Sequence, residues 1–245
     1  MDKSGIKDFF IKYVVREDCT CNLCKREVFD KENFCADCEK QIVRVKDNIC
    51  VHCGRPTFLS DGYCLMCKKY TPCFSKARSV FSYEEPIRRL IIAYKSDNKK
   101  YLSRVFAKEM KPVFDKEFSH VDFLTYVPIS KNKMKIRKYN QAKLIADELS
   151  VLVNVPSINT LEKVKETDDQ KSLSLDERLE NLSGAFKVVD RQAVKNKKIL
   201  VIDDILTTGS TAHAVAKVLY NAGAAEVDLL TVASRRDELK GVDIV

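Results

Sequence analysis

One run, residues 198–211, constrains the fold more than any other part of the chain. It begins with four consecutive apolar residues, 199–202, as in a parallel strand that is buried on both faces. Two carboxylates follow, and then a small turn rich in hydroxyl groups. Apolar residues at helical spacing come next, which predicts a strand, an acidic pair, a turn and a helix in that order. The acidic pair is Asp203 and Asp204, the turn is Thr207, Thr208, Gly209, Ser210 and Thr211, and the apolar helix positions are Ala212, Val215, Ala216, Val218 and Leu219.

This order of residues has a chemical interpretation. A helix that starts near Ser210 directs its first free N–H groups at the preceding turn, where they and the helix dipole favour an anion such as phosphate. Gly209 allows close approach of the backbone. The acidic pair suits a neighbouring group instead, either sugar hydroxyls that donate to carboxylates or a magnesium ion. Together these preferences indicate a ribose 5-phosphate, and the chain has neither a Walker A loop nor a Gly-x-Gly-x-x-Gly motif as a competing phosphate site.

The first part of the chain contains an internal repeat of cysteines. Two sets of paired Cys-x2-Cys knuckles have the same spacing, and the second set is offset from the first by 29 residues. Four thiolates in two such knuckles suit a tetrahedral Zn2+, and an Fe–S cluster or a redox dithiol fits the doubled pattern less well. The predicted metal ligands are Cys21, Cys24, Cys35, Cys38, Cys50, Cys53, Cys64 and Cys67.

The spacing leaves the number of zinc ions, one or two, and the pairing of the knuckles open. Sequential sites are the simplest arrangement, and an interleaved arrangement satisfies the same spacing. Cys19 and Cys73 are expected to be spare thiols. His52 lies inside a knuckle and is read as a loop residue, although it could replace one cysteine as a ligand. So small a module lacks a core of its own, so bound metal would supply its stability.

The rest of the chain alternates predicted strands and helices, which favours an α/β fold. A short amphipathic helix over residues 6–15 precedes the cysteines, and Pro72 marks a linker over 70–75. Asn140 is the expected N-cap of a helix whose buried face includes Ile145, Leu149 and Leu152. A polar stretch within 163–186, with a capping box at Ser174, is a candidate lid. Strands are predicted at 78–82, 123–128, 158–164, 186–189 and 226–232. One helix is predicted to begin near Pro86 and another to cover roughly 100–114, and Gly223 is predicted to end the helix that follows the turn at 207–211.

Charge is distributed unevenly along the chain. The net charge of +8 divides into +4 for residues 1–80, +8 for residues 81–145 and −4 for the remainder. Five positive charges in residues 131–138 directly follow the predicted strand at 123–128. Such a run is either a solvated surface or a rim that attracts a polyphosphate or a DNA backbone. No apolar run is long enough to span a bilayer. Ten cysteines without a recognisable signal peptide favour a reducing, cytoplasmic compartment, with membrane attachment only at the periphery.

Residues 201–211 resemble the phosphoribosyl-pyrophosphate (PRPP) loop of type I phosphoribosyltransferases, including both acidic residues. The whole chain resembles the ComF family, competence-associated members of that superfamily, in which paired cysteine knuckles precede a transferase-like domain. Residues 138–141, Lys-Tyr-Asn-Gln, are similar to a Gly-Phe-Asn-Gln element of the family. A second signature is matched at Thr167, Gln170, Leu173, Arg178, Asn181, Ala185 and Phe186.

The resemblance implies a twisted, mostly parallel sheet flanked by helices in residues 76–245, preceded by a zinc-ribbon module in residues 1–75. It implies that the PRPP-binding residues are Asp203, Asp204 and 207–211, and that Asn140, Gln141, Gln170, Arg178 and Asn181 belong to the family signature. The turn at Pro128, Ile129 and Ser130 is the candidate for the pyrophosphate side of the site. The chain departs from the family pattern at Lys138, which replaces glycine, at Tyr139, which replaces phenylalanine, and at Lys163 and Lys165, where arginines are common.

Two functions follow from these features. The first is a PRPP binder or Mg2+-dependent phosphoribosyltransferase, either of nucleotide salvage or with an unknown acceptor. The second is a DNA-uptake factor in natural transformation that acts on incoming single-stranded DNA, with a competence helicase or other DNA-uptake proteins as partners. The two are compatible, and the combination is the preferred interpretation. Turnover, the acceptor, the oligomeric state and the DNA-binding surface are left open by the sequence.

Overall fold

The computed structural model describes residues 20–28, 33–166 and 175–237 of the chain. These residues belong to two compact units, one up to Val43 and the other from Arg44 onward. The first four cysteines of the repeat lie in the first unit, whereas the second four lie in the same unit as the main sheet. The predicted division of the chain near residue 75 stays a prediction, and the helix predicted at 6–15 lies outside the described residues.

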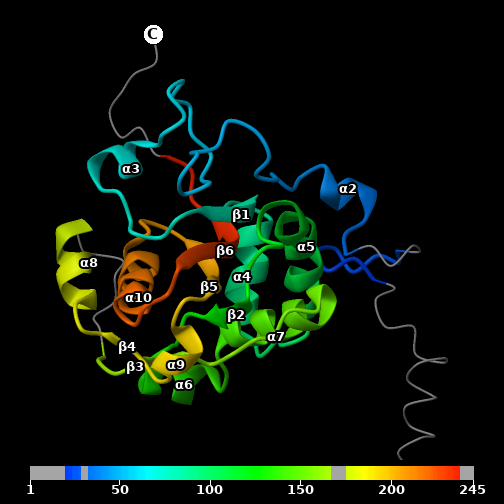
Figure 1. Cartoon of the computed structure of the whole chain (residues 1–245). Coiled ribbons are helices and arrows are strands. Elements are labelled where there is room, and N and C mark those ends of the chain that lie inside the picture. The colour runs from blue at the N-terminus through cyan, green and yellow to red at the C-terminus, as the bar shows by residue number, and fades with distance from the viewer. Residues whose placement is uncertain (1–19, 29–32, 167–174, 238–245) are drawn as a thin grey trace, which may run out of the picture. The chain divides into compact units, whose positions relative to one another are not determined.

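The second unit is organised around a parallel sheet of four strands in the order β1-β6-β5-β2 (Figure 1). Each neighbouring pair is parallel, and Asp203 in β5 lies opposite Thr231 in β6. The prediction of a mostly parallel sheet flanked by helices is therefore confirmed. The strands are β1 (Ala77–Ser82), β2 (Phe123–Tyr126), β5 (Lys198–Leu206) and β6 (Glu226–Ser234).

Helices cover both faces of this sheet (Figure 1). On one face lie α5 (Leu102–Glu117) and α7 (Gln141–Val153), and on the other lies α10 (Ser210–Asn221). Because successive strand residues point to opposite faces, apolar runs such as 199–202 supply a core to both layers. Ile199, Leu200, Val201 and Ile202 are all at most 2% exposed, as a buried central strand requires.

Most of the predicted helices are present with shifted ends. Helix α4 (Ile87–Ser96) begins directly after Pro86, and α10 ends shortly before Gly223, which has a φ of +97°. The prediction that Leu152 lies on the buried face of α7 is wrong, because this residue is 36% exposed. The buried face of that helix instead consists of Gln141, Ala142, Ile145, Ala146 and Leu149.

Two short strands lie outside the main sheet. They are β3 (Leu161–Lys163) and β4 (Phe186–Val188), which pair with each other in antiparallel orientation. Both are shorter than the strands predicted at 158–164 and 186–189. The predicted lid includes residues 167–174, which lie outside the described residues, so the capping box at Ser174 is also not described.

The remaining helices are short. None of the helices within the described ranges is long and apolar enough to cross a lipid bilayer. Helix α6 follows β2, α8 and α9 lie between β3 and β5, and α2 and α3 lie within the cysteine repeat. Their bounds are α2 (Ala36–Glu39), α3 (Leu65–Lys69), α6 (Lys131–Arg137), α8 (Leu175–Leu182) and α9 (Arg191–Val194).

Candidate functional site

A cavity of about 230 Å³ lies where β2 and β5 end at the carboxyl edge of the sheet. This edge is where open α/β sheets bind their ligands. Residues from the loops after both strands line it, together with side chains from α4, α6, α7 and the β3–β4 pair. The lining residues are Lys95, Val127, Pro128, Ile129, Lys133, Arg137, Asn140, Gln141, Ala142, Lys163, Phe186, Asp203, Asp204, Ile205, Thr207 and Thr211.

The acidic pair predicted from the sequence lines this cavity. Asp204 forms an ion pair with Lys95 of α4 at 2.8 Å, and its backbone N–H donates to Asp203 Oδ1 at 2.8 Å. Burial, reinforced by the charge of Asp204, raises the pKa of Asp203 to about 7. Asp203 therefore changes its charge near neutral pH, whereas an exposed aspartate would be ionised throughout that range.

The hydroxyl-rich turn after β5 contributes the next wall. Thr207 and Thr211 line the cavity. The hydroxyls of Thr208 and Ser210 are 2.9 Å apart, so they are hydrogen bonded to each other. Gly209 has a φ of +86° and precedes the first residue of α10, as the strand–turn–helix interpretation requires. The first turn of a helix of twelve residues therefore begins beside the cavity.

The turn predicted for the pyrophosphate side is only partly in the cavity. Pro128 and Ile129 line it. Ser130 instead caps α6, where its hydroxyl oxygen accepts from the N–H of Lys133 at 3.3 Å. Glu166 lies at the same helix end and accepts from the N–H of Asn132 at 3.2 Å.

Only some of the family-signature residues line the cavity. Asn140 caps α7 as predicted, and its amide nitrogen donates to the Val127 carbonyl at 2.9 Å, which joins the two loops that form the cavity wall. Gln141 is 1% exposed and accepts from Arg137 at 3.1 Å. Asn181 lies on α8 and is not among the residues that line the cavity. Gln170 lies outside the described residues, and only the backbone of Arg178 is described.

Positive charge surrounds the acidic pair. Lys133 and Arg137 belong to the basic run at 131–138, most of which forms α6. Because both side chains line the cavity, part of this run is a cavity wall and not only a solvated surface. Lys163 of β3 adds a further amino group to the cavity wall, and burial lowers its pKa.

Lys95 was missed by the sequence analysis. Its signal was present, because it continues the i, i+4 spacing of the buried residues Ile87 and Ile91.

The eight predicted cysteine ligands form two separate clusters. In each, the four sulfur atoms lie within 4.8 Å of one another, and the grouping is sequential. Cys24 and Cys35 sulfurs are 3.6 Å apart, and Cys53 and Cys64 sulfurs are 3.5 Å apart. Zn–S bonds of about 2.3 Å in a tetrahedron place sulfurs roughly 3.8 Å apart, so both clusters fit zinc. The second cluster is entirely buried, whereas Cys24 in the first is exposed.

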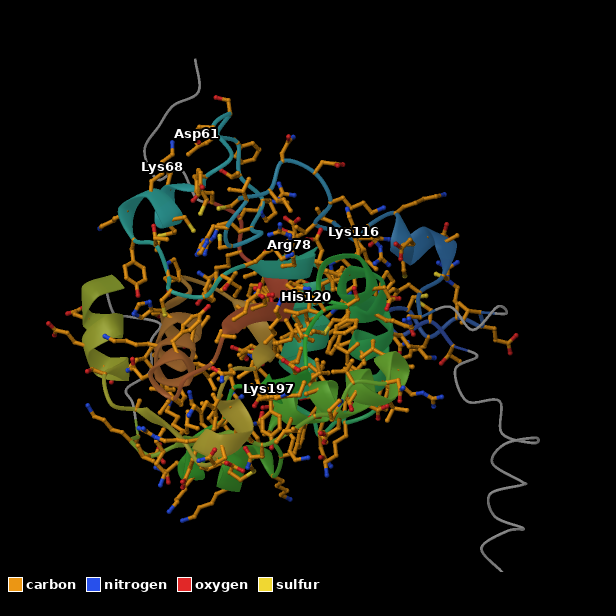
Figure 2. The ribbon with its side chains drawn as sticks, in the orientation of Figure 1. Asp61, Lys68, Arg78, Lys116, His120 and Lys197 are labelled. Atoms are coloured by element: carbon orange, nitrogen blue, oxygen red, sulfur yellow. The ribbon has the colours of Figure 1, made fainter. Side chains whose placement is uncertain are left out.

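Side chains around the second cluster take structural roles. His52 stacks on Phe74 and has its Nε2 3.0 Å from the Pro72 carbonyl, so it lies outside the sulfur group, as the loop interpretation expects. Asp61 and Lys68 form an ion pair at 2.5 Å across the second pair of knuckles (Figure 2). The Cys73 thiol donates to the His213 carbonyl at 3.4 Å.

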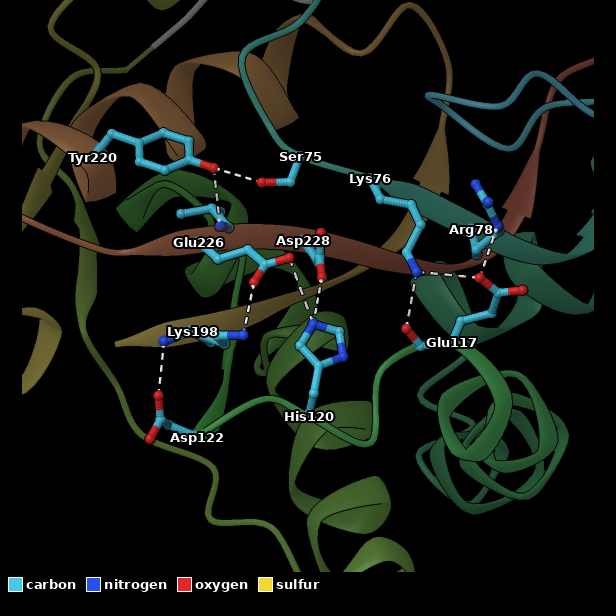
Figure 3. A network of polar contacts seen from close by, with 11 residues as sticks. Ser75, Lys76, Arg78, Glu117, His120, Asp122, Lys198, Tyr220, Glu226 and Asp228 are labelled. Atoms are coloured by element: carbon cyan, nitrogen blue, oxygen red, sulfur yellow. Dashed lines mark hydrogen bonds and ion pairs between the residues drawn. The ribbon is translucent and has the colours of Figure 1, made fainter. Parts of the chain in front are cut away.

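A third group of potential metal ligands lies at the amino-terminal end of β6 (Figure 3). His120 Nε2 is 3.5 Å from both Glu226 Oε1 and Asp228 Oδ2. Burial raises the pKa of Asp228 to about 6. Lys198 pairs with Glu226 at 3.4 Å. The Lys198 ammonium group therefore already balances part of the negative charge of Glu226 and Asp228. This group of residues lies at the edge of the sheet opposite the cavity.

Comparisons with protein families match both parts of the chain. Residues 141–244 match the family described as "Phosphoribosyl transferase domain", which includes the turn after β5 and the acidic pair. Residues 18–68 match the "Double zinc ribbon domain", which includes both cysteine clusters. The two matches agree with the phosphoribosyltransferase-type sheet and with the zinc-ribbon interpretation of the cysteines.

Individual relatives match most of the chain. Competence protein F of Haemophilus influenzae is 30% identical over 83% of this chain and 91% of its own. Competence protein ComFC of Bacillus subtilis is 27% identical over 82% of this chain and 84% of its own. The DNA utilization protein YhgH of Escherichia coli K12 is 26% identical over 85% of this chain and 94% of its own.

Proposed function

The chain belongs to the ComF family of competence proteins, and from this premise we propose that it handles incoming single-stranded DNA during natural transformation and binds PRPP in the cavity beside β5. Relatives described as competence and DNA utilization proteins support the cellular role. The residues that line the cavity support PRPP as the ligand.

One observation carries the assignment of the ligand. A single cavity contains two carboxylates, the start of a long helix and a wall of cations. A phosphate alone would not explain Asp203 and Asp204, and a sugar alone would not explain the lysines and arginine. PRPP combines a 5-phosphate, ribose hydroxyls and a pyrophosphate in one molecule, so it accounts for all three features.

The proposed arrangement assigns each part of PRPP to one wall. The turn from Thr207 to Thr211 holds the 5-phosphate, and the acidic pair accepts hydrogen bonds from the ribose hydroxyls. The pyrophosphate lies toward Pro128 and Ile129, where Lys133 and Arg137 supply positive charge. Mg2+ bound with the ligand would neutralise part of the pyrophosphate charge.

Gln141 adds an independent indication that the cavity takes a ligand. Its side chain is 1% exposed and its Oε1 accepts from Arg137, whereas its Nε2, which lies near the Tyr139 hydroxyl, has no well-formed hydrogen bond to any residue that the structure describes. A buried amide donor without an acceptor is unfavourable by about 1–3 kcal/mol. Because Gln141 lines the cavity, an oxygen atom of a bound ligand is the natural acceptor.

The DNA-handling role is proposed on charge and on family membership. Residues 1–145 carry a net charge of +12, which favours a polyanion. The two cysteine clusters would each hold one structural zinc ion, and the partners proposed are single-stranded DNA and other DNA-uptake proteins, a competence helicase among them.

Calorimetric titration of the zinc-loaded protein with PRPP, with and without Mg2+, tests the ligand. We expect Mg2+-dependent binding that is lost in the Asp203→Asn/Asp204→Asn double variant, because neutral amides present N–H donors toward hydroxyls that should donate to carboxylates. If the double variant binds PRPP as tightly as the wild type, the assignment is wrong. If the wild-type protein binds PRPP, the next experiment is to incubate it with PRPP and individual nucleobases. Release of pyrophosphate would identify a phosphoribosyltransferase of nucleotide salvage.

Binding to an oligodeoxynucleotide tests the DNA role separately. An electrostatic interaction with the phosphate backbone weakens as salt concentration rises. We expect affinity for single-stranded DNA to fall steeply between about 50 and 200 mM salt. An affinity that does not change with salt would contradict the electrostatic mechanism while leaving the PRPP site unaffected.

A further inference from the structure

The two repeats of the cysteine module have the same knuckle but place one arginine differently. Arg26 and Arg55 each follow the second cysteine of a knuckle by two residues. The intervening residue is left-handed in both, with φ of +66° at Lys25 and +67° at Gly54. The carbonyl of each arginine accepts at 2.8 Å from the N–H of the first cysteine of its knuckle. The backbones therefore match, and a difference between the arginines reflects their surroundings.

Each side chain contacts the second cysteine of its own knuckle, and the two differ in their other partner. Arg26 interacts with the thiol of Cys24 in its own knuckle and forms an ion pair with Asp37 at 3.0 Å, and both side chains of that ion pair are more than half exposed. Arg55 is 4% exposed. Its Nε donates to the Cys53 sulfur at 3.4 Å, and its Nη2 donates to the carbonyl oxygen of Thr207. One guanidinium thus joins a thiolate of the second cluster to the turn that follows β5.

The knuckle formed by Cys50 and Cys53 packs against β1, so the backbone that carries Arg55 is fixed relative to the sheet. A side-chain carbon at Gly54 would overlap the carbonyl oxygen of Ala77 in β1, so glycine is required there, whereas the first repeat accommodates Lys25. The N–H of Ala77 donates to the His52 carbonyl at 2.8 Å. Arg55 therefore connects two parts of one compact unit that pack closely.

Holding the Thr207 carbonyl has a consequence for phosphate binding. The C=O of Thr207 and the N–H of Thr208 belong to one planar peptide and point in opposite directions. Arg55 therefore fixes the direction of the Thr208 N–H as well as that of the carbonyl. It also keeps a carbonyl oxygen, which would repel a phosphate, engaged with a cation.

We propose that Arg55 is a positioning residue that makes the PRPP affinity of the cavity depend on metal in the second cysteine cluster. Four thiolates around Zn2+ carry a net negative charge, which retains the guanidinium, and the guanidinium retains the turn at Thr207. The first cluster, whose Arg26 pairs with Asp37, has no part in this coupling. The inference rests on the proposed PRPP site.

The test compares Arg55→Met with Arg26→Met, its counterpart in the first repeat, in the full-length zinc-loaded protein. We expect both variants to keep two zinc ions by elemental analysis. Arg55→Met should weaken PRPP binding about tenfold, as expected for loss of a hydrogen bond to a charged group. It should also speed hydrogen exchange of the amides at 208–211. Arg26→Met should change neither the PRPP affinity nor the exchange rate.

Arg55→Lys is a third variant, which keeps the positive charge but loses the two-pronged geometry of the guanidinium. It should retain zinc and bind PRPP with an affinity between those of Arg55→Met and the wild type.

Two outcomes would overturn the proposal. One is an Arg55→Met protein that keeps its zinc and binds PRPP as the wild type does. The other is unchanged exchange of the amides at 208–211 in that variant. Exchange is measured without ligand, so it decides the coupling even if the wild type fails to bind PRPP and the proposed function is wrong. Near-ultraviolet circular dichroism distinguishes a folded variant from one that has lost its structure.

Discussion

Asp203 links the proposed PRPP site to pH at the scale of a single residue. Burial and the neighbouring charge of Asp204 raise its pKa to about 7. Below that pH the carboxyl group is protonated, and above it the carboxylate can accept from two ribose hydroxyls. We therefore expect the affinity for PRPP to rise as pH increases from about 6 to 8, by up to roughly tenfold, as the ionised fraction grows. Calorimetry in a series of buffers measures this change.

The control for that prediction is Asp203→Asn. The phosphate groups of the ligand also titrate, with a second pKa near 6, so part of the pH dependence belongs to the ligand. The variant keeps the ligand's contribution and loses that of Asp203. If wild type and variant show pH profiles of the same shape, Asp203 is not the titrating group.

At the scale of elements, α6 ends in a conformation that its sequence does not favour. Lys138 follows the helix with a φ of +63°, a conformation that glycine adopts most readily. A side chain in this left-handed region costs about 1–2 kcal/mol relative to the right-handed one, and glycine avoids that cost. We expect Lys138→Gly to raise the free energy of unfolding by about 0.5–1 kcal/mol, measured by denaturant titration. Lys135→Gly, inside the same helix, should lower it by about 1 kcal/mol. A loss of stability in Lys138→Gly would contradict this account.

The same scale shows what sequence periodicity can predict. The strand at 199–202 and the helix after the turn were predictable, because their apolar spacing is unambiguous, but the structure continues the strand through the acidic pair to Leu206. Strands β3 and β4 have only three residues each, so alternation could neither fix their ends nor show that they pair outside the main sheet. The basic run at 131–138 was read from charge alone, and charge does not show that Lys133 and Arg137 turn toward a cavity.

At the scale of the whole molecule, motifs predicted the chemistry, while the contacts between distant segments had to come from the structure. The acidic pair, the hydroxyl-rich turn and the cysteine spacing were all visible in the sequence. The ion pair between Lys95 and Asp204 and the contact between Arg55 and Thr207 join residues more than 100 positions apart. Local patterns carry no information about such pairs. The repeat likewise indicated two equivalent sets of knuckles and left their pairing open, and only the structure shows two sequential clusters, one of which belongs to the unit with the cavity.

Zinc removal should therefore occur in two steps with different consequences. Cys24 is exposed, whereas Cys50, Cys53, Cys64 and Cys67 are each at most 4% exposed, so a chromogenic chelator should extract the first ion quickly and the second slowly. Samples withdrawn after the fast phase should bind PRPP with unchanged affinity. Samples withdrawn after the slow phase should bind it at least about tenfold more weakly, because Arg55 loses the charge that retains it. Loss of PRPP binding during the fast phase would contradict the assignment of the coupling to the second cluster.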